Sequence, residues 1–249
     1  MINEHARFTI AQQYLRAVEH LASRVGNPIL HTVVDFLQTF CCLIIPQRDG
    51  KFSAGKPLHE KFAGSGIGDN VWVYVHDHED LQHLSEDCAI SLFLGKKDVP
   101  ANYHHDNRFL VLRQMSYSPF FQGLLIAHEG FHAMTLTKSE ELPDHDIHEY
   151  EAHCFEHELL REIGGSIYQQ LLQQRIEQIR MELKERSIAD CGPLMDFTYP
   201  LSLDGLWGSY RSTSEARMRK WELHQHAIYY LIQELDISYA EKAQIANLL

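Results

Sequence analysis

Residues 124–132 read Leu124-Leu125-Ile126-Ala127-His128-Glu129-Gly130-Phe131-His132, a segment in which apolar residues lead directly into a chemically active pattern. His128 and His132 are four residues apart, so on a helix they project from one face a turn apart, with Glu129 beside them. This HExxH pattern is typical of a helix that binds Zn²⁺ through two imidazoles and carries a carboxylate that activates water. Only three positions are fixed, so the flanking sequence must supply a helix and a third ligand.

The residues before the pattern predict where its helix begins. Ser118 can cap free backbone N–H groups, and Pro119 suits the first helical position. The HExxH residues then fall in the middle of the helix. Its apolar neighbours are expected to pack against a sheet; they are Phe121, Leu124, Leu125 and Met134.

Three short runs rich in β-branched and aromatic residues precede this helix. They are Val71–Val75, Ala89–Leu94 and Arg108–Arg113, and each predicts a strand. Further helices are expected on both sides of this region from apolar spacing and from Gly and Pro boundaries. They are 3–24, 28–43, one that begins near 147 and breaks at Gly164-Gly165, 166–186, 214–235 and 239–248.

These elements predict an α+β, predominantly helical fold. We expect one domain, residues 1–249, with N-terminal helices over 1–45, a core over 70–163 that packs a small sheet on the HExxH helix, and additional C-terminal helices over 166–249.

The composition indicates which partners the protein is not expected to bind and in which compartment its cysteines are expected to lie. The net charge of −12 argues against nucleic acid and against an anionic membrane surface, because both attract clustered Lys and Arg. The five cysteines include no CxxC pair, so reduced thiols in a cytoplasm-like compartment are expected rather than disulfides or a cysteine zinc site. No secretory signal is visible at the N-terminus, although export by a route without such a signal stays open. The apolar run 29–45 contains polar residues and is shorter than about 20 residues, so we expect a buried helix.

A catalytic zinc site needs three protein ligands and an open position for water. Glu151 follows His132 after 18 intervening residues and is itself followed by the small Ala152. This arrangement resembles the gluzincin branch of zinc metallopeptidases, in which a glutamate on the helix after the motif helix completes the site. The segment Glu149–Leu160 is also similar to the ligand helix of the ImmA/IrrE family of bacterial regulatory metallopeptidases. The resemblance covers roughly residues 118–160.

The resemblance implies a zincin-like core and a zinc-dependent peptidase acting on a peptide or protein substrate. It implies Zn²⁺ ligands His128, His132 and Glu151, with Glu129 as the catalytic base. It also implies that an extended substrate adds to the edge of the strand Arg108–Arg113. Oxyanion donors in this family come from downstream helices, and several residues qualify here: Tyr199, Tyr210, His224, His226 and Tyr229. Glu158 or Asp146 is expected to orient an imidazole.

Two kinds of alternative stay open. The segment His153-Cys154-Phe155-Glu156-His157 matches HxxEH, the inverted zincin motif, on a different helix face from Glu151. The chain is alternatively a non-catalytic metal-binding protein, or a regulatory helical module whose partners bind its amphipathic C-terminal helices. The sequence leaves the oligomeric state undetermined.

Overall fold

A computed structural model of the chain describes residues 3–46, 52–53, 55–64, 70–76, 101–104, 108–113, 118–138, 145–185 and 239–249. The chain divides into two compact units, Met1–Leu142 and Pro143–Leu249. The boundary falls within the segment 70–163 that was expected to form one core, and the single domain stays a prediction. The α+β, predominantly helical class is confirmed.

Three helices of the first unit begin within one residue of their predicted starts, each after a residue whose side chain caps it. They are α1 (Glu4–Ala22), α2 (Pro28–Phe40) and α4 (Pro119–Lys138). The side chain of Asn27 accepts hydrogen bonds from the N–H groups of Ile29 and Leu30 at 2.9 and 3.2 Å. Ser118 Oγ likewise accepts from Phe121 N–H at 3.3 Å, which confirms the predicted start of α4.

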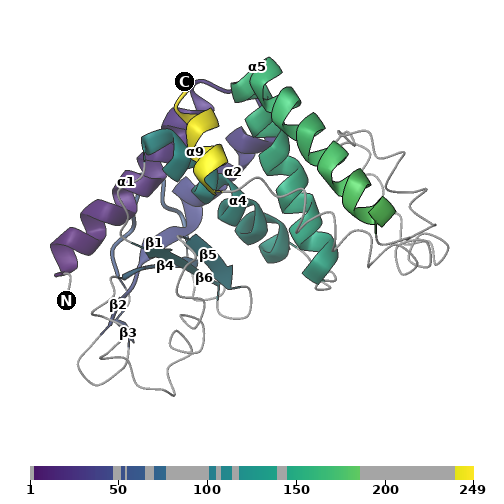
Figure 1. Ribbon diagram of the computed structural model, residues 1–249. Coiled ribbons are helices and arrows are strands. Elements are labelled where there is room, and N and C mark those ends of the chain that lie inside the picture. The colour runs from purple at the N-terminus through teal and green to yellow at the C-terminus, as the bar shows by residue number, and fades with distance from the viewer. Residues whose placement is uncertain are drawn as a thin grey trace. The chain divides into compact units, whose positions relative to one another are not determined.

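The first unit also contains a four-stranded sheet in the order β1-β4-β6-β5 (Figure 1). The strands β1, β4 and β6 are parallel, whereas β5 runs antiparallel to β6. The buried β-branched residues of β4 fit a strand covered on both faces. The strands are β1 (Cys41–Leu43), β4 (Val71–His76), β5 (Ala101–His104) and β6 (Phe109–Arg113), with a separate hairpin of β2 (Ile45–Pro46) and β3 (Phe52–Ser53).

Two predictions about this region are corrected. The helix expected over 28–43 ends at Phe40, because residues 41–43 pair with β4 as a strand. The strand over 108–113 lies between β4 and β5, so in the part of the sheet that the structure describes the outermost strand on this side is β5. The strand expected over 89–94 and the helix expected over 214–235 lie outside the described residues.

Helix α1 is fastened to the sheet by two polar side chains. The buried guanidinium of Arg7 donates to the Val75 carbonyl and lies 5.5 Å from the centre of the Tyr74 ring. The hydroxyl of Tyr14 donates to the Arg113 carbonyl at 2.8 Å. Both carbonyls belong to the ends of parallel strands, so these bonds fix α1 across β4 and β6.

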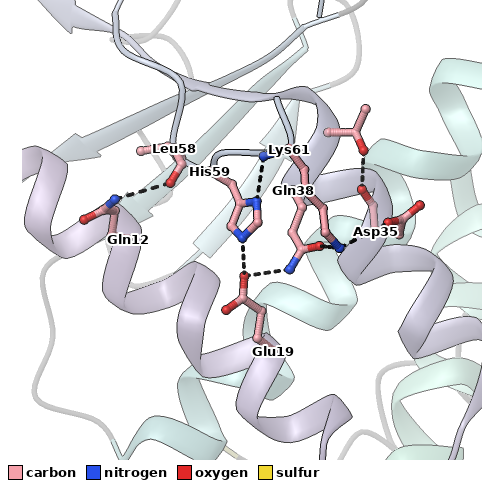
Figure 2. A network of polar contacts seen from close by, with 8 residues as sticks. Gln12, Glu19, Asp35, Gln38, Leu58, His59 and Lys61 are labelled. Carbon is pink, nitrogen blue, oxygen red and sulfur yellow. Dashed lines mark hydrogen bonds and ion pairs between the residues drawn. The ribbon is translucent and has the colours of Figure 1, made fainter. Parts of the chain in front are cut away.

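A polar network joins the segment 55–64 to α1 and α2 (Figure 2). The amide of the buried Gln38 donates to Glu19 at 2.8 Å and accepts from Lys61 Nζ at 2.6 Å. His59 lies between the same partners, with Nε2 at 3.6 Å from Glu19 and Nδ1 accepting from Lys61 N–H at 3.1 Å. Because Gln38 is buried, its satisfied amide fixes how this segment crosses the two helices.

Two glycines let α4 approach the other helices of the first unit closely. A Cβ on Gly123 would lie 2.7 Å from the Ala17 carbonyl oxygen of α1. A Cβ on Gly130 would lie 2.7 Å from Val33 Cγ1 of α2. The glycine inside the HExxH pattern is therefore explained by helix packing.

We expect Gly123→Ala to lower the free energy of unfolding by about 1 to 3 kcal/mol, because the clash with a backbone carbonyl outweighs the better helix propensity of Ala. Urea unfolding followed by circular dichroism measures this. Gly130→Ala is the graded control, since its clash is with side-chain methyl groups, and it should cost less. A Gly123→Ala protein as stable as the wild type would contradict this account of the packing.

In the second unit the described residues form α5 (His145–Glu185) and α9 (Tyr239–Ala246). The predicted break is confirmed at Gly165, whose φ of 49° and ψ of −124° interrupt α5. A Cβ on Gly164 would lie 3.1 Å from Ile245 Cγ2, so the glycine pair allows both the kink and the close packing of α9. Helix α9 confirms the helix expected over 239–248.

None of the helices within the described ranges is both long enough and apolar enough to cross a membrane. The run 29–45, which raised that question, forms α2 and β1 with buried apolar residues such as Leu30, Val33 and Leu37.

Candidate metal centre

Helix α4 presents the three HExxH residues from its middle. The apolar residues predicted to hold it are buried, namely Phe121, Leu124, Leu125 and Met134. His132 is also buried, whereas His128 and Glu129 are half-buried. The helix therefore fixes the backbone of the pattern while two of its polar side chains stay partly accessible.

The two imidazoles converge on one point. His128 Nε2 and His132 Nε2 are 3.2 Å apart, and the ring planes meet at 70°. Two nitrogens bound to one tetrahedral Zn²⁺ at about 2.0 to 2.1 Å are separated by about 3.3 Å. The observed separation of the two Nε2 atoms is close to that value.

The same distance also fits a direct hydrogen bond between two neutral imidazoles, one donating and the other accepting. Such a bond would leave a His pair with a purely structural role. Metal content distinguishes the two interpretations, because an imidazole hydrogen bond needs no cation.

Glu129 is held by the sheet. Its Oε2 accepts a hydrogen bond of 2.6 Å from the backbone N–H of Tyr103 in β5. Carboxylates accept short hydrogen bonds because the acceptor is charged. One oxygen of the predicted base is therefore held by the sheet. No local pattern indicates this contact, because β5 was not predicted.

The predicted third ligand, Glu151, lies on α5 in the second unit. Its side chain is buried, and this burial raises the pKa of Glu151 to about 8. Ionising a carboxyl in such surroundings is costly, and a bound cation offsets that cost. Burial therefore favours the neutral form of the Glu151 carboxyl unless a cation lies beside it.

Two further residues of α5 form another candidate ligand pair, of which His153 was considered only as part of the inverted motif and Glu149 was not predicted. Glu149 and His153, one turn apart, present ligand atoms within 4.8 Å of one another. At about 100° per residue, each lies about 200° around the helix from Glu151. The i, i+4 spacing of Glu149 and His153 was the signal in the sequence that could have identified this second candidate face.

The residues of the inverted motif contact other side chains of the second unit. Glu156 forms a buried ion pair with Lys242 of α9 at 2.9 Å, and His153 Nδ1 lies 3.6 Å from the same carboxylate oxygen. His157 Nδ1 is hydrogen-bonded to the Tyr168 hydroxyl. In an active inverted motif the glutamate acts on water, whereas here Glu156 pairs with an ammonium group, so a structural role explains this segment better.

Several predicted site residues lie outside what the structure describes. They include every candidate oxyanion donor, Tyr199, Tyr210, His224, His226 and Tyr229. The Asp146 side chain also lies outside the described part, and Glu158 is half-buried on α5. Another carboxylate of α5, Glu156, lies beside His153 of the same helix, with its Oε2 at 3.6 Å from His153 Nδ1.

Comparison with known proteins gives no relative for this chain. No protein-family model, no curated protein and no solved structure matches it. Any function must therefore be argued from the residues and their geometry.

Proposed function

We propose that this chain is a zinc-dependent peptide-bond hydrolase whose metal is held by His128, His132 and Glu151. The observation that carries the proposal is the 3.2 Å separation of the two Nε2 atoms on α4. The resemblance of residues 118–160 to gluzincins supplies the third ligand. The small sheet beside α4, with an antiparallel outermost strand in its described part, is compatible with a zincin-like core.

Each residue has a distinct role in this proposal. His128 and His132 bind as neutral imidazoles through Nε2, and Glu151 binds as a carboxylate. A zinc ion, when bound, lowers the pKa of water towards about 7 and polarises the substrate carbonyl. Glu129 accepts a proton from the attacking water and passes it to the leaving amine.

The choice of ligand on α5 gives a direct prediction. If Glu151 is the ligand, Glu151→Gln should weaken zinc binding by more than the about 10- to 100-fold that loss of a supporting residue costs. Glu149→Gln should leave binding within about tenfold of the wild type, since Glu149 lies on another face of α5. Titration with a zinc indicator measures both. The opposite ranking would move the third ligand to the Glu149 and His153 face and contradict this assignment.

Two other functions are kept as candidates, and one experiment separates all three. The zinc content of the purified protein is measured first, and a peptide library is then tested for cleavage with and without a chelator. The proposed hydrolase contains zinc and loses cleavage with the chelator. A non-catalytic metal-binding protein contains zinc but does not cleave the peptides. A regulatory helical module binds partners through its C-terminal helices, and the chelator does not change that binding.

The compartment is part of the same proposal. Cys41, Cys42 and Cys154 are buried free thiols. Together with the cysteine spacing this supports a reducing, cytoplasm-like compartment.

A further inference from the structure

We propose that the backbone N–H of Tyr103 is the positioning group for the base Glu129. It holds Oε2, so that Oε1 stays directed to the water from which the proton is taken. This inference rests on the proposed function for its catalytic consequence, whereas the contact itself is independent of it. The contact links the outermost described strand, β5, to the centre of α4, and both belong to the first unit.

The register of the sheet directs the backbone N–H of Tyr103 away from β6. The carbonyl of Arg108 accepts from Trp72 N–H of β4 at 2.8 Å, so the even-numbered residues of β6 direct their backbone groups to β4. Odd-numbered residues then direct theirs to β5. In the antiparallel pair β5–β6, Asn102 faces Val111, and Tyr103 faces Leu110. The Asn102 pair is therefore hydrogen-bonded, and the Tyr103 pair is not.

An N–H in this position points away from β6, on the outer side of the last strand that the structure describes. The 2.6 Å bond to Glu129 Oε2 is shorter than the usual 2.7 to 3.2 Å range of N–H···O bonds, as expected for a charged acceptor. A strand backbone is also a more rigid donor than a side chain, because no rotamer must be fixed. Tyr103 thus constrains the carboxylate of Glu129 through its amide and not through its ring.

The catalytic test removes this single N–H. Incorporation of the α-hydroxy analogue of tyrosine at position 103 replaces the amide by an ester and keeps the side chain. We expect kcat to fall by about 10- to 100-fold, because a base displaced by about 1 Å loses that much, while KM changes less than about twofold. The matched control is an ester at Ala101, whose N–H also points away from β6. This ester should leave kcat near the wild-type value.

A second measurement does not depend on activity. In protein labelled with ¹⁵N-tyrosine, the Tyr103 amide proton should resonate far downfield, and Glu129→Ala should move it upfield. Glu19→Gln, a change in α1, should leave it in place. The same spectra show whether each variant is folded.

The outcomes are distinguishable. If the ester variant at position 103 is folded and fully active, Tyr103 does not position Glu129. If Glu129→Ala does not shift the Tyr103 amide resonance, the hydrogen bond itself is absent. Absence of hydrolysis in the zinc-loaded wild type overturns the proposed function and the catalytic role with it. In that case the spectrum still establishes whether the contact exists.

Discussion

Glu129→Gln is expected to keep its zinc and to lose peptide hydrolysis by about 10²- to 10⁴-fold, the contribution of a positioned base. Gln has the shape of Glu, and its amide oxygen can still accept the Tyr103 N–H, so the change removes basicity and preserves position. His128 and His132 are untouched, so the metal remains. Steady-state cleavage of a library-derived peptide, with zinc content measured on the same sample, tests both halves of the prediction.

The control for this prediction is His132→Ala, which should lose the metal as well as the activity, because it removes one of the two converging Nε2 atoms. The pair of variants separates chemistry from metal binding. A Glu129→Gln protein with stoichiometric zinc and undiminished peptidase activity would show that Glu129 is not the base.

Lys242→Met is expected to lower the free energy of unfolding by about 3 to 5 kcal/mol. Lys242 Nζ lies 2.9 Å from Glu156 Oε2, and both side chains are only 3% exposed. Removal of the ammonium group leaves a carboxylate buried without that counter-charge, which costs more than the loss of an exposed pair. Urea unfolding followed by circular dichroism measures the change.

Two controls make this test specific. The double variant Lys242→Met/Glu156→Leu should recover most of the lost stability, because apolar residues of similar size can replace a buried pair. Lys56→Met breaks a pair with Glu4 whose side chains are 67% and 51% exposed, and it should cost less than about 1 kcal/mol. A Lys242→Met protein that is no less stable than Lys56→Met would contradict the role of the buried pair.

The elements that local sequence signals specify were predicted well. Asn27-Pro28 and Ser118-Pro119 place the starts of α2 and α4, because capping and proline geometry depend on neighbouring residues only. The kink at Gly165 follows equally from local backbone preference. The placement of His128 and His132 on one face likewise follows from the helix period, and their Nε2 atoms lie 3.2 Å apart.

The strands β4 and β6 were predicted from their β-branched residues, whereas β1 and β5, whose own residues do not indicate a strand, were missed. Cys41–Leu43 continues the apolar character of α2 and becomes a strand only because β4 lies beside it. The strand β5 contains the polar residues Asn102 and His104, which resemble a turn until β6 supplies their register. The pairing of Glu156 with Lys242 joins residues 86 positions apart, and no local pattern indicates it.

Zinc binding by the two imidazoles of α4 is tested by the zinc content of the folded protein. The protein is purified without chelator, and elemental analysis compares it with His128→Ala and His132→Ala. We expect one zinc per chain in the wild type and background levels in both variants. A folded wild-type protein that neither contains zinc nor takes it up on titration would contradict this expectation, and would leave the 3.2 Å contact as a hydrogen bond between two histidines.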